Sequence, residues 1–153
     1  WFDDETTKNR ERLENFCRAF EENNVLAIEN GFHEYLEDMI SIRDTNVRKG
    51  MKENFYHGLL LGILGNMDNW IVQSNAESGD GYSDISIEIR RKGVGIVIEL
   101  KYAENGALEE ACKEAVEQIN KRNYEESLRN DGMTTIYKYG IACYKKRCKV
   151  ISG

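Results

Sequence analysis

The most constraining feature of this sequence is a short segment that is almost entirely apolar and ends in a charged pair. Residues 94–100 read Val-Gly-Ile-Val-Ile-Glu-Leu, and Lys101 follows. Successive residues of a strand face opposite sides of a sheet, so a strand that is covered on one face alternates apolar and polar residues. This segment does not alternate, which predicts an interior strand covered on both faces, over 94–102. A carboxylate in such a strand is costly unless it is paired or binds a metal.

A second strand is predicted over residues 83–90, immediately before the first. Isoleucine occupies alternate positions on one face of it, and Asp84 belongs to the opposite face. Glu99 and Lys101 also share a face, because they are two residues apart in a strand. If the two strands form a hairpin, all three charged side chains lie on one side of the sheet.

The register of this hairpin depends on its turn, and two turns fit the sequence. A turn at residues 91–92 places Asp84 directly opposite Glu99, with Cβ atoms roughly 4.5–5.5 Å apart. A turn at residues 92–93 shifts the pairing by two residues and keeps the charged side chains on one face. Two carboxylates this close repel each other, and a divalent cation such as Mg²⁺ relieves the repulsion. Glu99 with Lys101 alone is more typical of a surface ion pair, but the apolar flank and Asp84 favour a metal site.

The order of these residues resembles the D…(D/E)-x-K signature of the PD-(D/E)XK nuclease superfamily. The signature is carried by Asp84 and by Glu99-Leu100-Lys101. Three further segments extend the resemblance: Glu53-Asn-Phe-Tyr-His57-Gly58, Ser78-Gly-Asp-Gly81-Tyr-Ser-Asp84 and Gln118-Ile119. The combination is similar to the nuclease-like domain that follows AAA-ATPase-like domains in many bacterial and archaeal proteins. It covers roughly residues 25–150, although the chain has no proline and so lacks the Pro of the superfamily's name.

The resemblance implies an α/β fold of the restriction-endonuclease-like type. Its αβββαβ core is a mixed central sheet flanked by helices, here with extra N-terminal helices. The implied activity is metal-dependent hydrolysis of phosphodiester bonds with Mg²⁺ or Mn²⁺, on DNA in the first place and with RNA as the other substrate. The alternative is a non-catalytic nucleic-acid-binding or regulatory module of an ATPase-containing protein. An upstream ATPase-like domain and a second copy of the chain are the implied protein partners.

The implied metal ligands are carboxylates, helped by one backbone carbonyl. Asp84 and Glu99 would hold the ion, with Glu53 and the carbonyl of Leu100 as further ligands. Glu53 has a simpler reading from the residues alone, because an acidic side chain in the first turn of a helix is stabilised by the helix dipole. The resemblance favours the metal role for it.

Two more residues complete the implied catalytic set. Lys101 would stabilise the transition state electrostatically, because its pKa would have to fall far below ~10.4 before it could act as a base near neutral pH. Gln118 is implied to point from its helix toward the active site, although an exposed glutamine on a helix needs no explanation.

Candidate nucleic-acid contacts lie outside the signature. They are Tyr56, His57, Arg90, Arg91, Lys145 and Lys146. Basic residues beside aromatic ones can bind phosphates and stack on bases, but solvated turns explain both basic clusters equally well. The net charge of −6 argues mildly against nucleic-acid binding, since such proteins usually carry a basic surface. We expect His57 to have a positioning or structural role rather than to act as a base.

The remaining pattern predicts the order of elements. Helices are expected over 8–22, 25–41, 51–65 and 107–122, and strands over 69–75, 83–90, 94–102, 134–143 and 146–152. The segments 44–49 and 77–81 are expected to be loops, the second with solvated acidic side chains. Residues 1–24 are interpreted as an N-terminal helix or linker from an upstream domain, and 25–153 as the nuclease-like domain.

Composition fits this picture and limits the other classes of protein. A chain of 153 residues with 41% hydrophobic and 31% charged residues suits one globular domain. Its apolar runs are far shorter than the ~20 residues of a membrane-spanning helix, and its first residues do not resemble a signal peptide. The four cysteines form no C-x-x-C pair, which argues against a zinc site. A cytoplasmic location is the resulting expectation.

Overall fold

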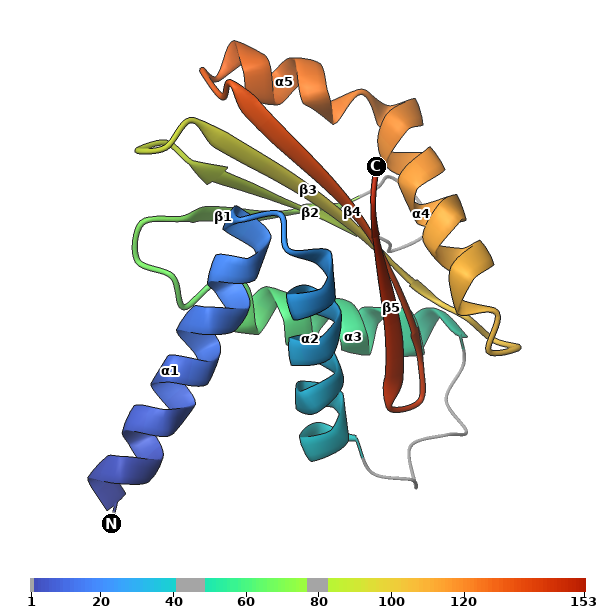
Figure 1. Cartoon of the computed structure of the whole chain (residues 1–153). Coiled ribbons are helices and arrows are strands. Elements are labelled where there is room, and N and C mark those ends of the chain that lie inside the picture. The colour runs from blue at the N-terminus through green and yellow to red at the C-terminus, as the bar shows by residue number, and fades with distance from the viewer. Residues whose placement is uncertain (1, 41–48, 77–82) are drawn as a thin grey trace.

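The computed structural model describes residues 2–40, 49–76 and 83–153, and these form one five-stranded sheet with helices around it (Figure 1). The strands are β1 (Ile71–Ala76), β2 (Ser83–Ile89), β3 (Val94–Tyr102), β4 (Thr135–Tyr144) and β5 (Arg147–Ser152). The helices are α1 (Phe2–Glu21), α2 (Val25–Met39), α3 (Lys49–Leu64), α4 (Leu108–Arg122) and α5 (Tyr124–Asn130). Each predicted strand is found within two residues of its expected ends.

The sheet is mixed, as the fold class requires. Its strands lie in chain order. β1 is antiparallel to β2, β2 to β3 and β4 to β5, while β3 and β4 are parallel. Parallel neighbours need a crossover connection, and α4 with α5 supplies it between β3 and β4. The α3-β1-β2-β3-α4-β4 order confirms the αβββαβ core and the mixed sheet flanked by helices.

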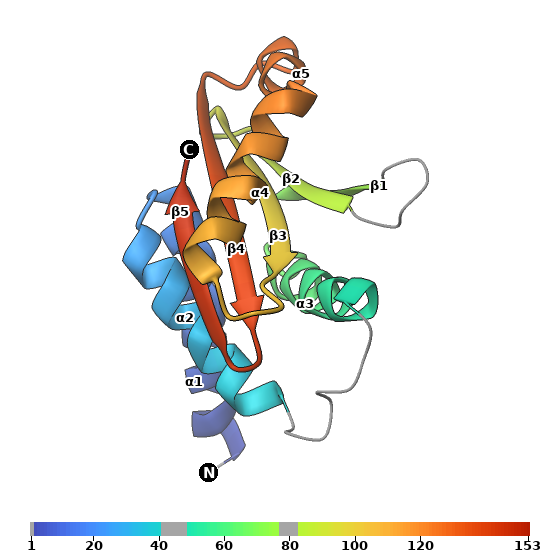
Figure 2. The same ribbon diagram turned by 90° about the vertical axis from the view of Figure 1, so that its right-hand side faces the viewer.

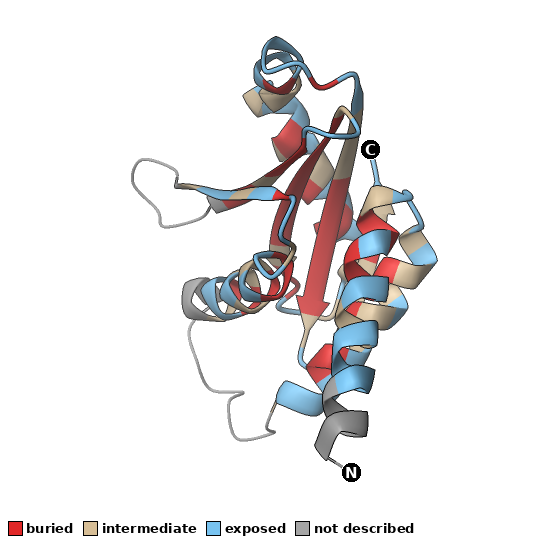
Figure 3. Ribbon diagram, turned by 90° about the vertical axis from the view of Figure 1, so that its left-hand side faces the viewer, coloured by how far each residue is buried: buried red, intermediate tan, exposed pale blue. Residues whose placement is uncertain are grey.

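β3 is the interior strand that the sequence predicted. It pairs with β2 on one side and β4 on the other, and every residue from Val94 to Leu100 is buried. Figure 3 shows buried residues along the central strands of the sheet, with exposed residues on the helices that face the viewer. Burial on both faces explains why the segment lacks the alternation of a half-exposed strand.

Helices cover both faces of the sheet. The side chains of α1, α2 and α3 pack with the isoleucines of β2 and β3 in the main core. On the other face, α4 lies across β3 and β4, as Figure 2 shows from that side, while β1 extends beyond it. Gly140 in β4 permits this close approach, since a Cβ there would lie 2.5 Å from the carbonyl oxygen of Cys112 in α4.

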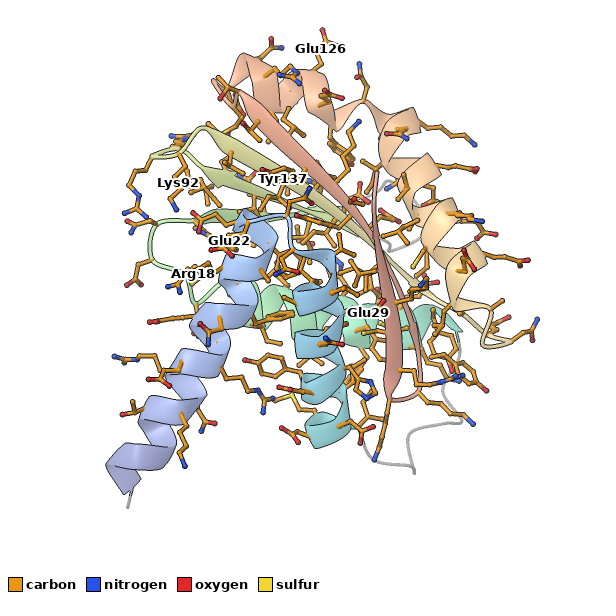
Figure 4. All side chains as sticks on the ribbon, in the orientation of Figure 1. Arg18, Glu22, Glu29, Lys92, Glu126 and Tyr137 are labelled. Carbon is orange, nitrogen blue, oxygen red and sulfur yellow. The ribbon has the colours of Figure 1, made fainter. Side chains whose placement is uncertain are left out.

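The C-terminal half of α1 belongs to the main core. Phe16 and Phe20 are buried there, and the hydroxyl of Tyr139 in β4 donates to the carbonyl of Phe20 at 2.9 Å. Figure 4 shows Lys92 beside this end of α1, where its Nζ lies 2.8 Å from Glu21 Oε1. The division of the chain at residue 24 stays a prediction, although the packing joins α1 to the sheet.

The sequence did not predict α5. Its seven residues have no apolar stripe, and only Leu128 is buried. Asn123, with φ of 54°, ends α4 and separates the two helices in a left-handed conformation. The loop expected over 77–81, with its acidic side chains, lies outside the described residues, as does most of 44–49. None of the helices in the described ranges is long and apolar enough to span a membrane.

Candidate active site

The β2–β3 hairpin has the first of the two predicted registers. Ile85 pairs with Ile98 and Ile89 pairs with Val94, so the next residues in this register are Asp84 and Glu99. The turn that closes the hairpin spans residues 90–93 and is centred on 91–92, with backbone hydrogen bonds of 3.0 and 3.2 Å. The prediction that Asp84 lies opposite Glu99 is therefore confirmed.

Both carboxylates are buried. Asp84 is 0% exposed and Glu99 is 2% exposed, and they share the sheet face that α4 partly covers. Two buried like charges at this separation require a positive partner, because neither has water to solvate it. The repulsion between these two carboxylates, predicted from the sequence, therefore applies to buried side chains.

Arg122 supplies the positive partner, and the sequence did not predict it. Its Nη1 donates to Asp84 Oδ1 at 2.9 Å and Oδ2 at 2.8 Å, and it lies 3.4 Å from Glu99 Oε2. The residue stands at the C-terminal end of α4, one turn after Gln118, whose Oε1 lies 3.5 Å from Arg122 Nη2. The four-residue spacing from Gln118 was the available signal, because such residues share a helix face.

Lys101 lies on the same side of β3, as predicted. Its Nζ is 3.6 Å from Glu99 Oε1, and its side chain is 14% exposed. The two carboxylates are thus flanked by two cations, Arg122 from the helix and Lys101 from the strand. A phosphate that approached this group would meet positive charge from both.

Glu53 is buried in α3 and contacts the backbone at the end of β3. Its Oε1 accepts a hydrogen bond of 3.1 Å from the backbone N–H of Tyr102, at the end of β3. α3 begins at Lys49, so Glu53 lies beyond the first turn and the helix-dipole reading was wrong. Across the described ranges, no three His, Cys, Asp or Glu side chains gather to hold a metal ion. The metal role of Glu53 stays a prediction.

Two further side chains border the carboxylates. Burial raises the pKa of Tyr124 to about 12, and its hydrogen bond to Asp84 adds to the effect. His57 in α3 hydrogen-bonds Ser74 in β1 at 2.9 Å. Burial lowers the pKa of His57, against the opposing effect of the Asp84 charge, which favours the neutral ring. This fits a positioning role for His57.

The predicted nucleic-acid contacts lie in different places. Tyr56 is a core residue whose hydroxyl donates to the carbonyl of Lys145 at 2.8 Å. The β4–β5 turn that carries Lys145 and Lys146 lies at the end of the sheet where β3 finishes, near Lys101. Arg90 and Arg91 are exposed at the opposite end of β3.

The distance of each basic turn from Glu99 follows from strand geometry. Val94, next to the turn at residues 90–93, is five residues from Glu99, which is about 17 Å along a strand. Gly140, the β4 partner of Glu99, is also five residues from Lys145, so the two basic clusters lie at opposite ends of the sheet at similar distances from Glu99. Arg90 also pairs with Glu88, its Nη2 lying 3.5 Å from Glu88 Oε2.

A polar groove continues the carboxylate face over β1 and β2. It encloses about 130 Å³ and is lined by Ile71, Gln73, Asn75, Ser86, Glu88, Tyr124, Ser127, Leu128 and Asp131. Asn75 is the cross-strand partner of Asp84, and Tyr124 contacts Asp84, so the groove begins at the carboxylates. A larger hollow of about 450 Å³ lies between α1 and α2, away from these groups.

The donor set fits a hard divalent cation. Mg²⁺ is commonly held by one or two carboxylates and completes its coordination with water and substrate phosphate. Asp84 and Glu99 supply the two carboxylates, converging on one cationic nitrogen. Leu100 lies between Glu99 and Lys101 in β3, and its carbonyl as a ligand stays a prediction.

Comparison with known families agrees with this geometry. The family model described as the PD-(D/E)XK nuclease superfamily matches residues 51–153, which contain α3 except its first two residues, the whole sheet and the carboxylate pair. Neither the curated proteins nor the solved structures give a significant match. The match covers more than half of the chain and includes the D…E-x-K residues in their paired strands. The chain therefore belongs to the PD-(D/E)XK nuclease superfamily.

Proposed function

We propose that this domain is a metal-dependent nuclease that hydrolyses phosphodiester bonds, with DNA as its main substrate. The observation that carries the proposal is the buried Asp84–Glu99 pair, which lies on one face with Lys101 at the end of two paired strands. A fold has little structural use for two adjacent buried carboxylates, because their burial is costly and their repulsion adds to it. A cation-dependent reaction gives them a use.

Each residue then has a defined task. Asp84 and Glu99 would hold one or two Mg²⁺ or Mn²⁺ ions, with Leu100 and Glu53 as the further candidates. Such an ion supplies an acidified water as nucleophile and positive charge for the phosphate. Lys101 holds positive charge beside the reacting phosphate and orients the attacking water, while Gln118 positions the Arg122 side chain.

Approach of the substrate is governed by charge. The carboxylates would repel a phosphate backbone in the absence of cations, so the surrounding positive groups are needed for binding. Lys145 and Lys146, in the turn at the same end of the sheet, are proposed to contact the backbone. Tyr56 contributes indirectly, because it holds that turn through the carbonyl of Lys145.

A second candidate function has a specific observation behind it. Arg122 neutralises Asp84 and Glu99 inside the protein, so the pair can be stable without any metal. A domain of this kind could keep the nuclease fold and bind nucleic acid or an ATPase-like partner domain without cutting. Metal binding separates the two functions, because only the nuclease requires it.

The test uses linear, circular and single-stranded DNA and RNA, each with Mg²⁺, Mn²⁺ or EDTA. We expect cleavage that needs a divalent ion and disappears in Asp84→Asn and Glu99→Gln. Glu114→Gln is the matched control, since it removes an exposed carboxylate of α4 and should cleave like the parent. Absence of cleavage on every substrate, together with absence of Mn²⁺ binding by calorimetry, would leave the binding module as the better proposal.

A further inference from the structure

The Arg122 contact has an unusual geometry for an arginine–carboxylate pair. Arginine commonly binds a carboxylate through two parallel N–H···O bonds from different nitrogens. Here one nitrogen, Nη1, lies within 2.8–3.4 Å of three oxygens, two of Asp84 and one of Glu99. The nitrogen therefore stands where the carboxylate oxygens converge.

That point is also where a divalent cation shared by Asp84 and Glu99 would have to lie. Mg²⁺ binds its oxygens at about 2.0–2.1 Å, well inside the nitrogen–oxygen distances observed. A metal ion and a guanidinium nitrogen cannot share one position, and their like charges would repel at close range. Arginine stays protonated at any ordinary pH, so it can make room only by moving.

The position of Arg122 in the fold allows such a movement. It is the last residue of α4, and the left-handed Asn123 follows it. Its side chain is 20% exposed, so a path to solvent exists. Gln118, one turn earlier, contacts the other terminal nitrogen and can guide the guanidinium while Nη1 leaves the carboxylates.

We infer that Arg122 is an exchangeable internal counterion, which occupies the cation position of Asp84 and Glu99 in the metal-free protein and withdraws when a divalent ion binds. This inference rests on the metal site of the proposed function. It assigns Arg122 a role as a positioning residue that competes with the metal. The competition keeps the two carboxylates together and neutralised until the ion arrives.

The competition between Arg122 and the metal ion can be measured as a change in the apparent metal affinity. If Arg122 closes the position in about 90% of metal-free molecules, the apparent metal affinity is about tenfold weaker than that of the open form. Removing the guanidinium while keeping the length of the side chain should restore the affinity of the open form. Arg122→Met does this, and Arg122→Lys retains a cation that can still compete.

The experiment is calorimetric titration with Mn²⁺ alone, without nucleic acid. We expect Arg122→Met to bind Mn²⁺ about tenfold more tightly than the parent, and Arg122→Lys to bind much as the parent does. Arg129→Met is the matched control, because it removes an exposed arginine of α5 that pairs with Glu125, and its affinity should equal that of the parent. Binding by Arg122→Met with none by the parent would also support the exchange.

Two outcomes would overturn the inference, and they differ in what they say of the function. Equal Mn²⁺ affinity in the parent and Arg122→Met would exclude the exchange and leave the nuclease proposal intact. Absence of binding in both, with Arg122→Met folded, would remove the metal site itself and with it the proposed function.

A measurement on the parent protein covers the case in which Arg122→Met does not fold. Nitrogen-15 NMR of the arginine side chains reports hydrogen-bonded guanidinium groups, and Arg122→Lys identifies the Arg122 signal. Saturation with diamagnetic Mg²⁺ should shift this signal and speed the exchange of its protons, while the Arg129 signal stays in place. An unchanged Arg122 signal at saturating Mg²⁺ would overturn the inference.

Discussion

Asp84 and Glu88 of β2 share one face of the sheet but have different charged neighbours. Asp84 faces Glu99 at one end of the strand, and Arg122 places a cation between them. Glu88, four residues on, is 8% exposed and has Asp131 for a neighbour at the other end of the groove. In the described part of the chain its Oε1 has no hydrogen-bond partner, and its cation, Arg90, lies on the exposed surface.

The comparison shows two ways to relieve a crowded pair of acids. Asp84 and Glu99 have a cation, Arg122, packed between them. Burial raises the pKa of Glu88, and Asp131 adds to the effect, so this pair favours protonation over a buried cation.

The largest effect is expected from removing a charge of the first pair. Asp84→Asn should lower cleavage by about 10³-fold or more, since the residue would hold the ion on which the reaction depends. Glu88→Gln, the equivalent change at the other pair, should leave cleavage within a few-fold of the parent. Initial rates of cleavage of a labelled DNA duplex measure the effect of each variant. Equal losses of rate in the two variants would show that the two pairs do not differ in function.

The next effect concerns stability without metal. Arg122→Ala should lower the free energy of unfolding by about 3–5 kcal/mol, because it removes the cation beside buried Asp84 and leaves Glu99 with Lys101 alone. Arg90→Ala, which removes the exposed cation beside Glu88, should cost at most about 1 kcal/mol. Urea denaturation in EDTA compares the two. Added Mn²⁺ should restore much of the stability of Arg122→Ala, and a failure to do so would contradict a shared cation position.

A variant of Lys101 tests whether cleavage needs a second cation beside Asp84 and Glu99. Lys101→Met should lower the rate of cleavage by about 10²-fold while the affinity for Mn²⁺ stays the same or rises, because the substitution removes positive charge. Single-turnover rates and Mn²⁺ calorimetry separate these two quantities. Full activity in Lys101→Met would point to a contaminating nuclease or to a mechanism without this lysine.

The smallest expected effect is the pH dependence of stability that comes from Glu88 beside Asp131. A carboxyl whose pKa is raised by folding stabilises the protein below its unfolded pKa, and this contribution is lost as the pH rises through the folded pKa. Glu88→Gln should remove that loss, so its advantage over the parent should grow from pH 4 toward pH 7. The gain should stay below about 1 kcal/mol, because Glu88 lines a surface groove, where solvent screens its charge. Thermal denaturation over this pH range measures it.

The sequence predicted the parts of the site that depend on strand geometry. Alternation placed Asp84, Glu99 and Lys101 on one face, and the hairpin turn allowed a register that the structure confirms. Glu53 and Arg122 show where this reasoning stops. The carboxylate of Glu53 was assigned to the metal, but its Oε1 accepts from the backbone of Tyr102.

The spacing from Gln118 places Arg122 on the same helix face, but no local rule connects the end of that helix to the start of a strand 38 residues earlier. Its placement depends on how closely α4 approaches β4, and Gly140 allows that approach through the missing side chain. Packing of this kind involves residues far apart in the chain, and their hydrophobic periodicity does not encode it.

The sequence by itself determined that this chain has an interior strand with a carboxylate pair on one face, because the two-residue period of a strand is a local property. It also determined the family and the mixed sheet. Only the tertiary structure decided which cation neutralises the pair and which backbone group Glu53 contacts. The reason is physical, since a buried charge is satisfied by whichever partner the packing brings within reach, wherever that partner lies in the sequence.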